Sequence, residues 1–371
     1  MKRLAIFLDG TWNTLDNNTN VWRLKSLTAE MPDQRVYYCQ GVGTRKGERA
    51  LGGITGYGID NEILDAYTWL VQNFEEGDEL FIFGFSRGAY TARCLSGLIC
   101  KCGILTLGAP LSIEQIYVRY RRPDATTIRT LLAGDLSTEP SLEERWLVKY
   151  SRPTKIRFLG VWDTVGQLGL PIVSMRLRIK KYCFLDTHLR PDNENAFHAL
   201  ALDEHRRIFE PTLWTRTGRR GDTEDQDRPI ENVEQRWFVG AHANVGGGYA
   251  SDPLAQFPLK WLMDKAAARG LVFRDQVEID QCEPLPPIMD SYRDFAYGLY
   301  RFTSKPFFRP IGNALTTRRI NETIDGSVFD RWRADEEYRP ANLARWARRK
   351  SVDPAELKYA VLATNPQLDV E

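Results

Sequence analysis

The chain has 371 residues, 43% of them hydrophobic, which is enough to bury a large core in one large domain or two ordinary ones. Its 50 Lys and Arg residues nearly balance 49 Asp and Glu residues, and the formal charge of +1 gives no reason to expect a nucleic-acid partner. The six cysteines are dilute and several lie in apolar runs, so we predict reduced core thiols, with no metal site and no cofactor.

The N-terminus predicts a first strand rather than a signal peptide. Residues 2–8 hold five apolar residues before Asp9, too few for the apolar core of a signal sequence. No apolar run in the chain approaches the roughly 18 residues that span a bilayer. We therefore expect a cytoplasmic protein and leave open both signal-independent export and peripheral contact of its short basic clusters with a membrane.

The next elements follow the strand and helix rhythm of a parallel sheet. Apolar runs predict strands at 35–39 and 80–83, and apolar residues at helical spacing predict a helix at 59–74 between them. The glycine-rich segment 41–58 lacks the Gly-Lys-Ser/Thr ending of a phosphate-binding loop, which favours a surface loop near the site. The predicted fold class is α/β, with a mostly parallel central sheet flanked by helices.

The remainder of the chain alternates periodic and irregular stretches. Residues 105–150 indicate a helical insertion broken by prolines, and one role for it is a lid. The later periodic stretches are a strand at 155–162, a helical pattern at 196–203, a strand at 235–239 and a helix at 254–269. The strands at 80–83, 155–162 and 235–239 each end close to a residue that is a candidate for catalysis.

The most informative motif is a nucleophile elbow at residues 84–88. Gly-Phe-Ser-Arg-Gly places Ser86 between Gly84 and Gly88, directly after an apolar strand and before a helical pattern at 89–99. The two glycines permit a sharp turn and the close passage of neighbouring segments, which a Cβ would obstruct. This context predicts a nucleophilic Ser86, against the alternative of a turn serine that caps a helix.

A serine nucleophile needs a general base, and His242 is the best candidate among the four histidines. It follows the strand at 235–239 and precedes the glycines at 246–248, where an α/β hydrolase carries its base. The patterns around His198 and His205 indicate structural or solvent-facing side chains. The alternative role for His242 is a hydrogen bond within its own loop.

The third member of a triad is an acid, for which Asp163 is the first candidate. It ends an apolar strand, and carboxylates at strand C-termini lie at the same edge of a parallel sheet as the elbow. The order Ser86, Asp163, His242 matches α/β hydrolases and matches neither chymotrypsin nor subtilisin. Asp252 and Asp203 are reserve candidates, and helix capping is the alternative role for Asp163.

Acyl transfer also requires two backbone donors for the oxyanion. One is predicted at Arg87, the residue after the nucleophile, and the second at Gly10 and Thr11 in the loop after the first strand. The alternative for this loop is a turn tied off by its own Asp9 and Asn13.

These motifs predict an α/β-hydrolase core at residues 1–270, with the helical insertion at about 105–150. The last part of the chain, 271–371, is proline-punctuated, aromatic and basic, and we expect it to pack on the core as a C-terminal extension. We find no internal repeat or low-complexity linker between the two parts.

Six longer motifs lie between residues 7 and 249. They are Phe-Leu-Asp-Gly-Thr-Trp-Asn (7–13), Gly-Val-Gly-Thr (41–44), Gly-Phe-Ser-Arg-Gly-Ala-Tyr-Thr-Ala-Arg (84–93), Val-Trp-Asp-Thr-Val-Gly (161–166), Ala-Leu-Asp-Glu-His-Arg-Arg-Ile-Phe-Glu-Pro (201–211) and Trp-Phe-Val-Gly-Ala-His-Ala-Asn-Val-Gly-Gly-Gly-Tyr (237–249). With these motifs the chain resembles the α/β hydrolases of the family of unknown function 2235, which includes the first class of type VI secretion lipase effectors. The resemblance implies a Ser-Asp-His esterase, with phospholipase A activity in the effectors, and selects the same three residues. One departure is Asn244, where the family loop is expected to carry Asp.

The leading functional hypothesis is a serine esterase or lipase that cleaves carboxylic esters, of phospholipids in particular, through Ser86, Asp163 and His242. One alternative is a thioesterase or acyltransferase with the same triad, and another is a catalytically silent binding scaffold. The expected partner is a lipid or small ester substrate, to which the resemblance adds a secretion or immunity partner.

Overall fold

The computed structural model describes residues 1–10, 18–41, 57–134, 139–165, 188–215, 228–249, 252–279, 285–295, 298, 300–312 and 319–362. Thr11, most of the glycine-rich segment 41–58 and the basic clusters at 176–181 and 216–220 lie outside the described residues.

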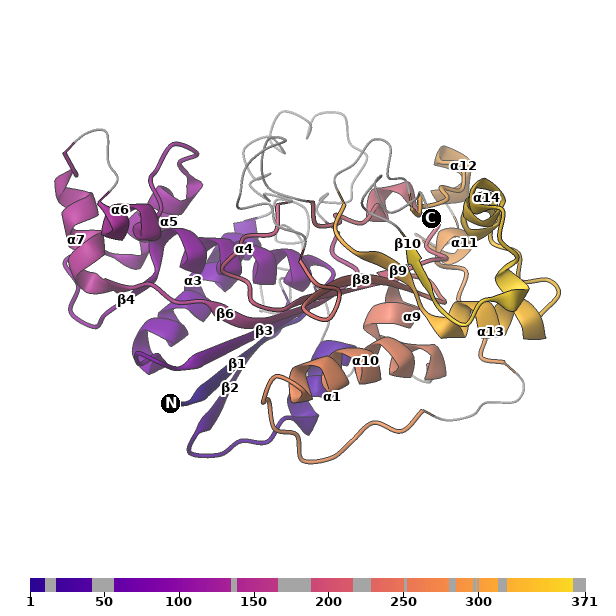
Figure 1. Ribbon diagram of the computed structural model, residues 1–371, viewed down its shortest axis with the longest axis horizontal. Coiled ribbons are helices and arrows are strands. Elements are labelled where there is room, and N and C mark those ends of the chain that lie inside the picture. Colours follow the sequence, from indigo (N-terminus) through magenta and orange to yellow (C-terminus); the bar gives the residue numbers. More distant parts are fainter. Residues whose placement is uncertain are drawn as a thin grey trace.

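The structure is built on one large sheet. Its strands are β1 Arg3–Leu8, β2 Gln34–Cys39, β3 Glu79–Phe85, β6 Ile156–Trp162, β7 Ala196–Ala201, β8 Val233–Phe238, β9 Glu322–Ile324 and β10 Ala360–Leu362. They are ordered β10-β9-β8-β7-β6-β3-β1-β2, and all neighbours pair in parallel except β10, which is antiparallel to β9 (Figure 1). A separate antiparallel pair consists of β4 Ile104–Leu105 and β5 Ser151–Arg152. The predicted α/β class with a mostly parallel sheet is confirmed.

Helices cover both faces of this sheet. The described helices are α1 Asn20–Leu27, α3 Tyr57–Asn73, α4 Arg87–Cys102, α5 Ile113–Arg121, α6 Ile128–Ala133, α7 Leu142–Tyr150, α9 His242–Gly246, α10 Gln256–Ala267, α11 Ser291–Asp294, α12 Tyr300–Thr303, α13 Gly326–Ala334 and α14 Ala341–Lys350, with short 3-10 turns η3 Arg207–Phe209, η4 Pro253–Ala255 and η5 Pro354–Glu356. Figure 1 shows α3 and α4 on one face and α1 and α10 on the other.

Alternate residues of the central strands belong to two different cores. In β1, Leu4 and Ile6 join the core under α3 and α4, whereas Ala5 and Phe7 join the core under α1 and α10. Both sets are fully buried, which explains why these strands are continuous apolar runs in the sequence. A third core joins β8 and β9 to α13 and α14, so the C-terminal residues extend the sheet. The boundary placed at residue 270 stays a prediction.

The helical pattern predicted at residues 196–203 is wrong, because residues Ala196–Ala201 form strand β7. This strand lies between β6 and β8 and is buried along its whole length. Its Ala and Leu residues favour a helix by intrinsic propensity, but pairing on both sides in the middle of the sheet overrides that preference.

The lid role suggested for residues 105–150 stays a prediction, and one contact of α6 bears on its place in the fold. Arg129 of α6 pairs with Asp192 at 2.6 Å, and the Asp192 carbonyl accepts a hydrogen bond from the N–H of Ile156, the first residue of β6. Helix α6 therefore lies near the edge where the parallel strands begin. Ser86 follows the end of β3, at the opposite edge.

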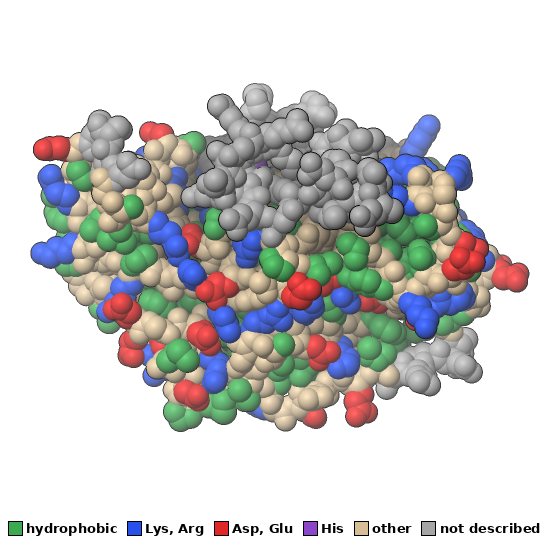
Figure 2. Space-filling model, viewed as in Figure 1, with side chains coloured by type: hydrophobic (Ala, Val, Ile, Leu, Met, Phe, Trp, Pro, Cys, Tyr) green, Lys and Arg blue, Asp and Glu red, His purple; other side chains and the backbone are tan. Residues whose placement is uncertain are grey.

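The face of the molecule shown in Figure 2 is mixed in charge. On the face shown in Figure 2, Lys and Arg side chains are interspersed with Asp and Glu side chains, as the balanced composition predicts. Within the described part of the chain, no helix is long and apolar enough to cross a bilayer.

Candidate active site

The turn between β3 and α4 holds Ser86 in a backbone conformation that L-residues rarely adopt, with φ 57° and ψ −118°. The flanking glycines are required by close packing. A Cβ on Gly84 would lie 2.4 Å from the carbonyl oxygen of Gly88, and a Cβ on Gly88 would lie 2.1 Å from the carbonyl oxygen of Leu8. The elbow is thus pressed against the end of β1, and Ser86 and Arg87 are the half-exposed residues at its tip.

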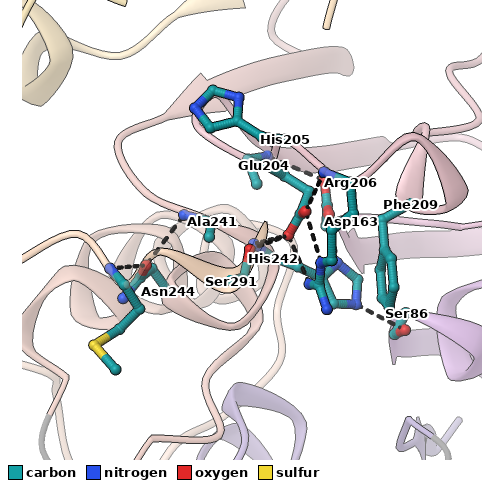
Figure 3. Close-up of polar contacts among 12 residues, drawn as sticks. Ser86, Asp163, Glu204, His205, Arg206, Phe209, Ala241, His242, Asn244 and Ser291 are labelled. Atoms are coloured by element: carbon teal, nitrogen blue, oxygen red, sulfur yellow. Dashed lines mark hydrogen bonds and ion pairs between the residues drawn. The ribbon is translucent and has the colours of Figure 1, made fainter. Parts of the chain in front are cut away.

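Three residues from three strand ends meet at this turn (Figure 3). The Nε2 atom of His242 lies 2.8 Å from the Oγ atom of Ser86, and its Nδ1 atom lies 2.5 Å from an Oδ atom of Asp163. Ser86 follows β3, Asp163 follows β6, and His242 begins α9 after β8. The structure therefore brings together the serine, acid and histidine that were predicted from the sequence.

Asp163 is fully buried, and both of its oxygens accept hydrogen bonds from the Arg309 guanidinium. Burial alone would raise the pKa of its carboxyl group, but the Arg309 guanidinium and the hydrogen bond with His242 outweigh burial and hold this pKa well below its usual range. Because the carboxylate carries no proton, the Nδ1–H of His242 must be the donor in their hydrogen bond. The Nε2 atom of the neutral imidazole is then left to accept the Ser86 hydroxyl proton.

Aromatic rings enclose the imidazole of His242. The Phe85 ring lies 4.7 Å and the Phe209 ring 4.9 Å from the imidazole centroid, and Phe209 is half-buried beside it (Figure 3). The Arg206 guanidinium lies over the Phe209 ring at 3.8 Å. These contacts restrict the orientation of the imidazole and keep it largely out of water.

The backbone of His242 is fixed by a second buried carboxylate, Glu204. Its Oε2 atom accepts hydrogen bonds from the His242 N–H at 3.2 Å and from the Ser291 hydroxyl at 2.9 Å. Burial favours a raised pKa for Glu204, but hydrogen bonds and charge from Arg206 outweigh it and lower the pKa to about 2. Glu204 is therefore an anion that ties the start of α9 to the end of β7.

The contacts of Asn244 give a physical reason for an asparagine at the position where an aspartate was expected. Its Oδ1 atom accepts the N–H groups of Ala241 and Met289, and its Nδ2 atom donates to both oxygens of Asp252 at 3.2 Å. Burial raises the pKa of Asp252 to about 6. An aspartate at position 244 would oppose this carboxylate with a like charge, whereas the amide donates to it.

The remaining predicted residues are less closely tied to the triad. The Gly10 N–H donates to the Asp9 carboxylate at 2.7 Å, and Thr11 lies outside the described residues. Arg87 occupies the first position of α4, and burial lowers the pKa of its guanidinium to about 10. Asp203, a reserve acid, instead accepts the Gly240 N–H at 2.8 Å. The oxyanion role of Gly10, Thr11 and Arg87 stays a prediction.

Four residues at the site were not predicted as functional: Glu204, Arg206, Phe209 and Arg309. The first three lie in one of the family-like motifs, at 201–211, which was the available signal. Arg309 has no such signal, since it contacts a residue 146 positions away. No group of His, Cys, Asp and Glu among the described residues is arranged to hold a metal ion.

Comparison with known proteins identifies the family of this chain. A family model described as the catalytic domain of Tle1-like phospholipase effectors of the type VI secretion system matches residues 2–265. The chain belongs to this family. The family predicted from the sequence motifs is thereby confirmed, and Ser86, Asp163 and His242 all lie within the matched residues.

Individual relatives of this family member are distant. An uncharacterized protein of Saccharomyces cerevisiae is 27% identical over 235 residues, which are 58% of this chain and 33% of the yeast protein. An uncharacterized protein from Pseudomonas aeruginosa is 18% identical, with a TM-score of 0.44 over 73% of this chain and 46% of its own. The Tle1 effector, solved bound to the VgrG spike, is also 18% identical, with a TM-score of 0.38 over 68% of this chain and 52% of its own. The chain therefore spans about a third to a half of the length of these three relatives.

Proposed function

We propose that this chain hydrolyses carboxylic esters of lipids through a covalent acyl-enzyme on Ser86. The observation that carries the proposal is the pair of His242 contacts, 2.8 Å to the Ser86 Oγ and 2.5 Å to Asp163. Membership in a family of phospholipase effectors favours acyl groups of phospholipids over other esters. We include in this proposal a phospholipase A activity, which releases a fatty acid from a phospholipid.

In the acylation half, the Nε2 atom of His242 removes the hydroxyl proton of Ser86 as Oγ attacks the ester carbonyl carbon. A C–O bond forms and the carbonyl π electrons move to the oxygen, which becomes an oxyanion. The imidazolium then returns the proton to the departing alcohol when the tetrahedral intermediate collapses. Asp163 stabilises the transient imidazolium and holds the other ring proton of His242 on Nδ1.

Deacylation repeats these steps with water as the nucleophile. His242 takes a proton from water, the hydroxide oxygen attacks the acyl carbon, and the protonated imidazole returns the proton to the Ser86 Oγ as the acyl bond breaks. The products are a carboxylic acid and an alcohol, and the enzyme is regenerated without an external reductant or oxidant.

The oxyanion would be stabilised at the start of α4. The N–H of Arg87 lies at the first position of a 16-residue helix, where the helix dipole favours negative charge. We place the second donor at Gly10 or Thr11, since the end of β1 packs against the elbow at Gly88. For Gly10 this role requires that its N–H leaves the Asp9 carboxylate to which it donates in the free protein. A single donor of this kind contributes on the order of 10²–10³-fold to turnover.

The two alternative functions differ in whether they use the triad. A thioesterase or acyltransferase would share the triad and differ in the leaving group or acceptor. A silent scaffold has no need of the strained backbone at Ser86, where φ is 57°, so the strain favours an enzyme. A secretion or immunity partner stays a prediction.

The test is fatty-acid release from phosphatidylcholine, phosphatidylglycerol and short acyl esters by wild type, Ser86→Ala, His242→Ala and the double variant. Each single variant should lose on the order of 10⁴-fold in kcat, and the double variant little more, because the triad acts as a unit. Equal release by wild type and Ser86→Ala, or thioester turnover with no oxygen-ester turnover, would contradict the proposal.

A further inference from the structure

Arg309 lies in the segment between α12 and β9, outside the residues 2–265 that the family model matches. Its side chain has no exposed surface. One terminal nitrogen donates to Asp163 Oδ1 at 2.7 Å and the other to Oδ2 at 3.0 Å. The same two nitrogens also donate to the carbonyls of Ala201 at 2.7 Å and Phe209 at 2.5 Å. The guanidinium is thus bound on both sides, to the acid of the triad and to the backbone.

Both oxygens of Asp163 are fully engaged by this arrangement. Oδ1 accepts from Arg309 and from the Ala201 N–H at 3.0 Å, while Oδ2 accepts from Arg309 and from His242. A rotation of the carboxylate would break the two parallel bonds of the guanidinium together. Its direction toward the imidazole is therefore fixed by a residue of the C-terminal segment.

We propose that Arg309 is a positioning residue of the triad: its guanidinium orients Asp163 toward His242 in a fully buried site, so that the C-terminal segment completes the active site. This inference rests on the proposed function of Ser86 and His242. Arg309 does not touch the reacting atoms and acts only through Asp163.

The position of this cation has a consequence for the imidazole. A positive charge beside Asp163 offsets part of the attraction between Asp163 and protonated His242. Two further charged or titratable groups lie near this pair. Glu204, which is paired with Arg206, binds the backbone N–H of His242. His198 of β7 lies near Asp163, and burial lowers the pKa of its imidazole to about 3. Removing the Arg309 charge would favour a protonated Asp163, and a protonated carboxyl no longer enforces the Nδ1–H form of His242, so activity would be lost at a higher pH than in wild type.

The test compares Arg309→Met and Arg309→Lys with Arg348→Met, a matched control at an exposed arginine of α14. The readouts are kcat, KM and the pH profile of kcat/KM on an ester that wild type hydrolyses, with rates normalised to the serine that a fluorophosphonate labels. We expect Arg309→Met to lower kcat on the order of 10- to 100-fold, as for other groups that orient a catalytic side chain, with little change in KM. The acid limb of its profile should move up by roughly one pH unit. Arg309→Lys should restore the position of the limb and part of kcat, and Arg348→Met should match wild type.

A double variant keeps the test valid if Arg309→Met folds poorly. Asp163→Asn/Arg309→Met removes both charges at once and leaves no unpaired buried ion. Its kcat should be no lower than that of Asp163→Asn alone, because Arg309 has nothing left to position. Multiplicative losses in the double variant would overturn the inference, as would a fall in kcat with the pH limb unmoved.

These outcomes separate the inference from the proposed function. A reactive, hydrolytic wild type with Arg309 variants of wild-type rate and pH profile would overturn only the role of Arg309. A folded wild type whose Ser86 neither labels nor hydrolyses ester would overturn the triad, and this role with it.

Discussion

Ion pairs at the two edges of the sheet differ in how far they are removed from water. At the edge where the parallel strands begin, Arg157 pairs with Glu79 and Glu194 at 3.4 and 3.2 Å, and its side chain is 39% exposed. At the edge where strands end, Asp163 and Arg309 are both 0% exposed. Exposed pairs contribute about 0–1 kcal/mol, whereas a buried pair costs desolvation that only good geometry repays. The difference indicates that the buried pair is kept for what it does to the site.

The largest effect is expected where the buried pair is broken at its acid. Asp163→Asn should lower kcat on the order of 10⁴-fold, because the amide no longer enforces the Nδ1–H form of His242. It should also lower the free energy of unfolding by about 3–5 kcal/mol, because Arg309 is left as a buried, uncompensated cation. Steady-state kinetics and urea unfolding measure the two losses separately.

Wild-type turnover by Asp163→Asn would contradict its role and redirect attention to Asp252. Loss of turnover with unchanged stability would instead show that the Asp163–Arg309 pair is no more costly to break than an exposed one.

A medium effect is expected at the loop that carries His242. Asn244→Asp should lower the free energy of unfolding by about 1–3 kcal/mol at pH 8, because two buried carboxylates then face each other. At pH 5 the loss should be smaller, since burial raises the pKa of Asp252 to about 6 and one carboxyl then holds a proton. Urea unfolding of wild type and variant at both pH values measures the difference.

The direction of this pH dependence follows because the folded protein binds the Asp252 proton more tightly than the unfolded chain does. With a folded pKa of about 6 against 3.8, the contribution of Asp252 to stability falls as pH rises through this window, and the added charge deepens that fall. The swap Asn244→Asp/Asp252→Asn is the matched control and should restore stability. A loss at pH 5 equal to that at pH 8 would contradict the like-charge explanation.

The smallest effect is expected at the exposed edge. Arg157→Ala should change the free energy of unfolding by no more than about 1 kcal/mol and leave kcat unchanged, because its partners remain solvated. Urea unfolding at low and high salt is the measurement. A loss of several kcal/mol there would erase the distinction between the two edges.

Much of the site could be predicted because its groups follow strands that are visible as apolar runs. Ser86, Asp163 and His242 each lie within a few residues of such a run, and parallel strands end at one edge of a sheet. The same logic fails for β7, where an Ala- and Leu-rich run is buried on both sides and carries no alternation to distinguish strand from helix.

Arg309 could not be predicted, because its role depends on a contact across 146 residues. Its neighbours Phe307 and Phe308 suggest packing rather than chemistry, and a single arginine in a basic segment has no local signature. Glu204 was visible in a family-like motif, but only tertiary packing turns it toward the His242 backbone.

The most direct test of the central claim is peptide mass spectrometry after treatment with a fluorophosphonate, which reports nucleophile activation without knowledge of the substrate. We predict labelling at Ser86 in wild type and its loss in both Ser86→Ala and His242→Ala. Folded wild-type protein that stays unlabelled, or labelling of Ser86 that persists without His242, would contradict a serine activated by this histidine.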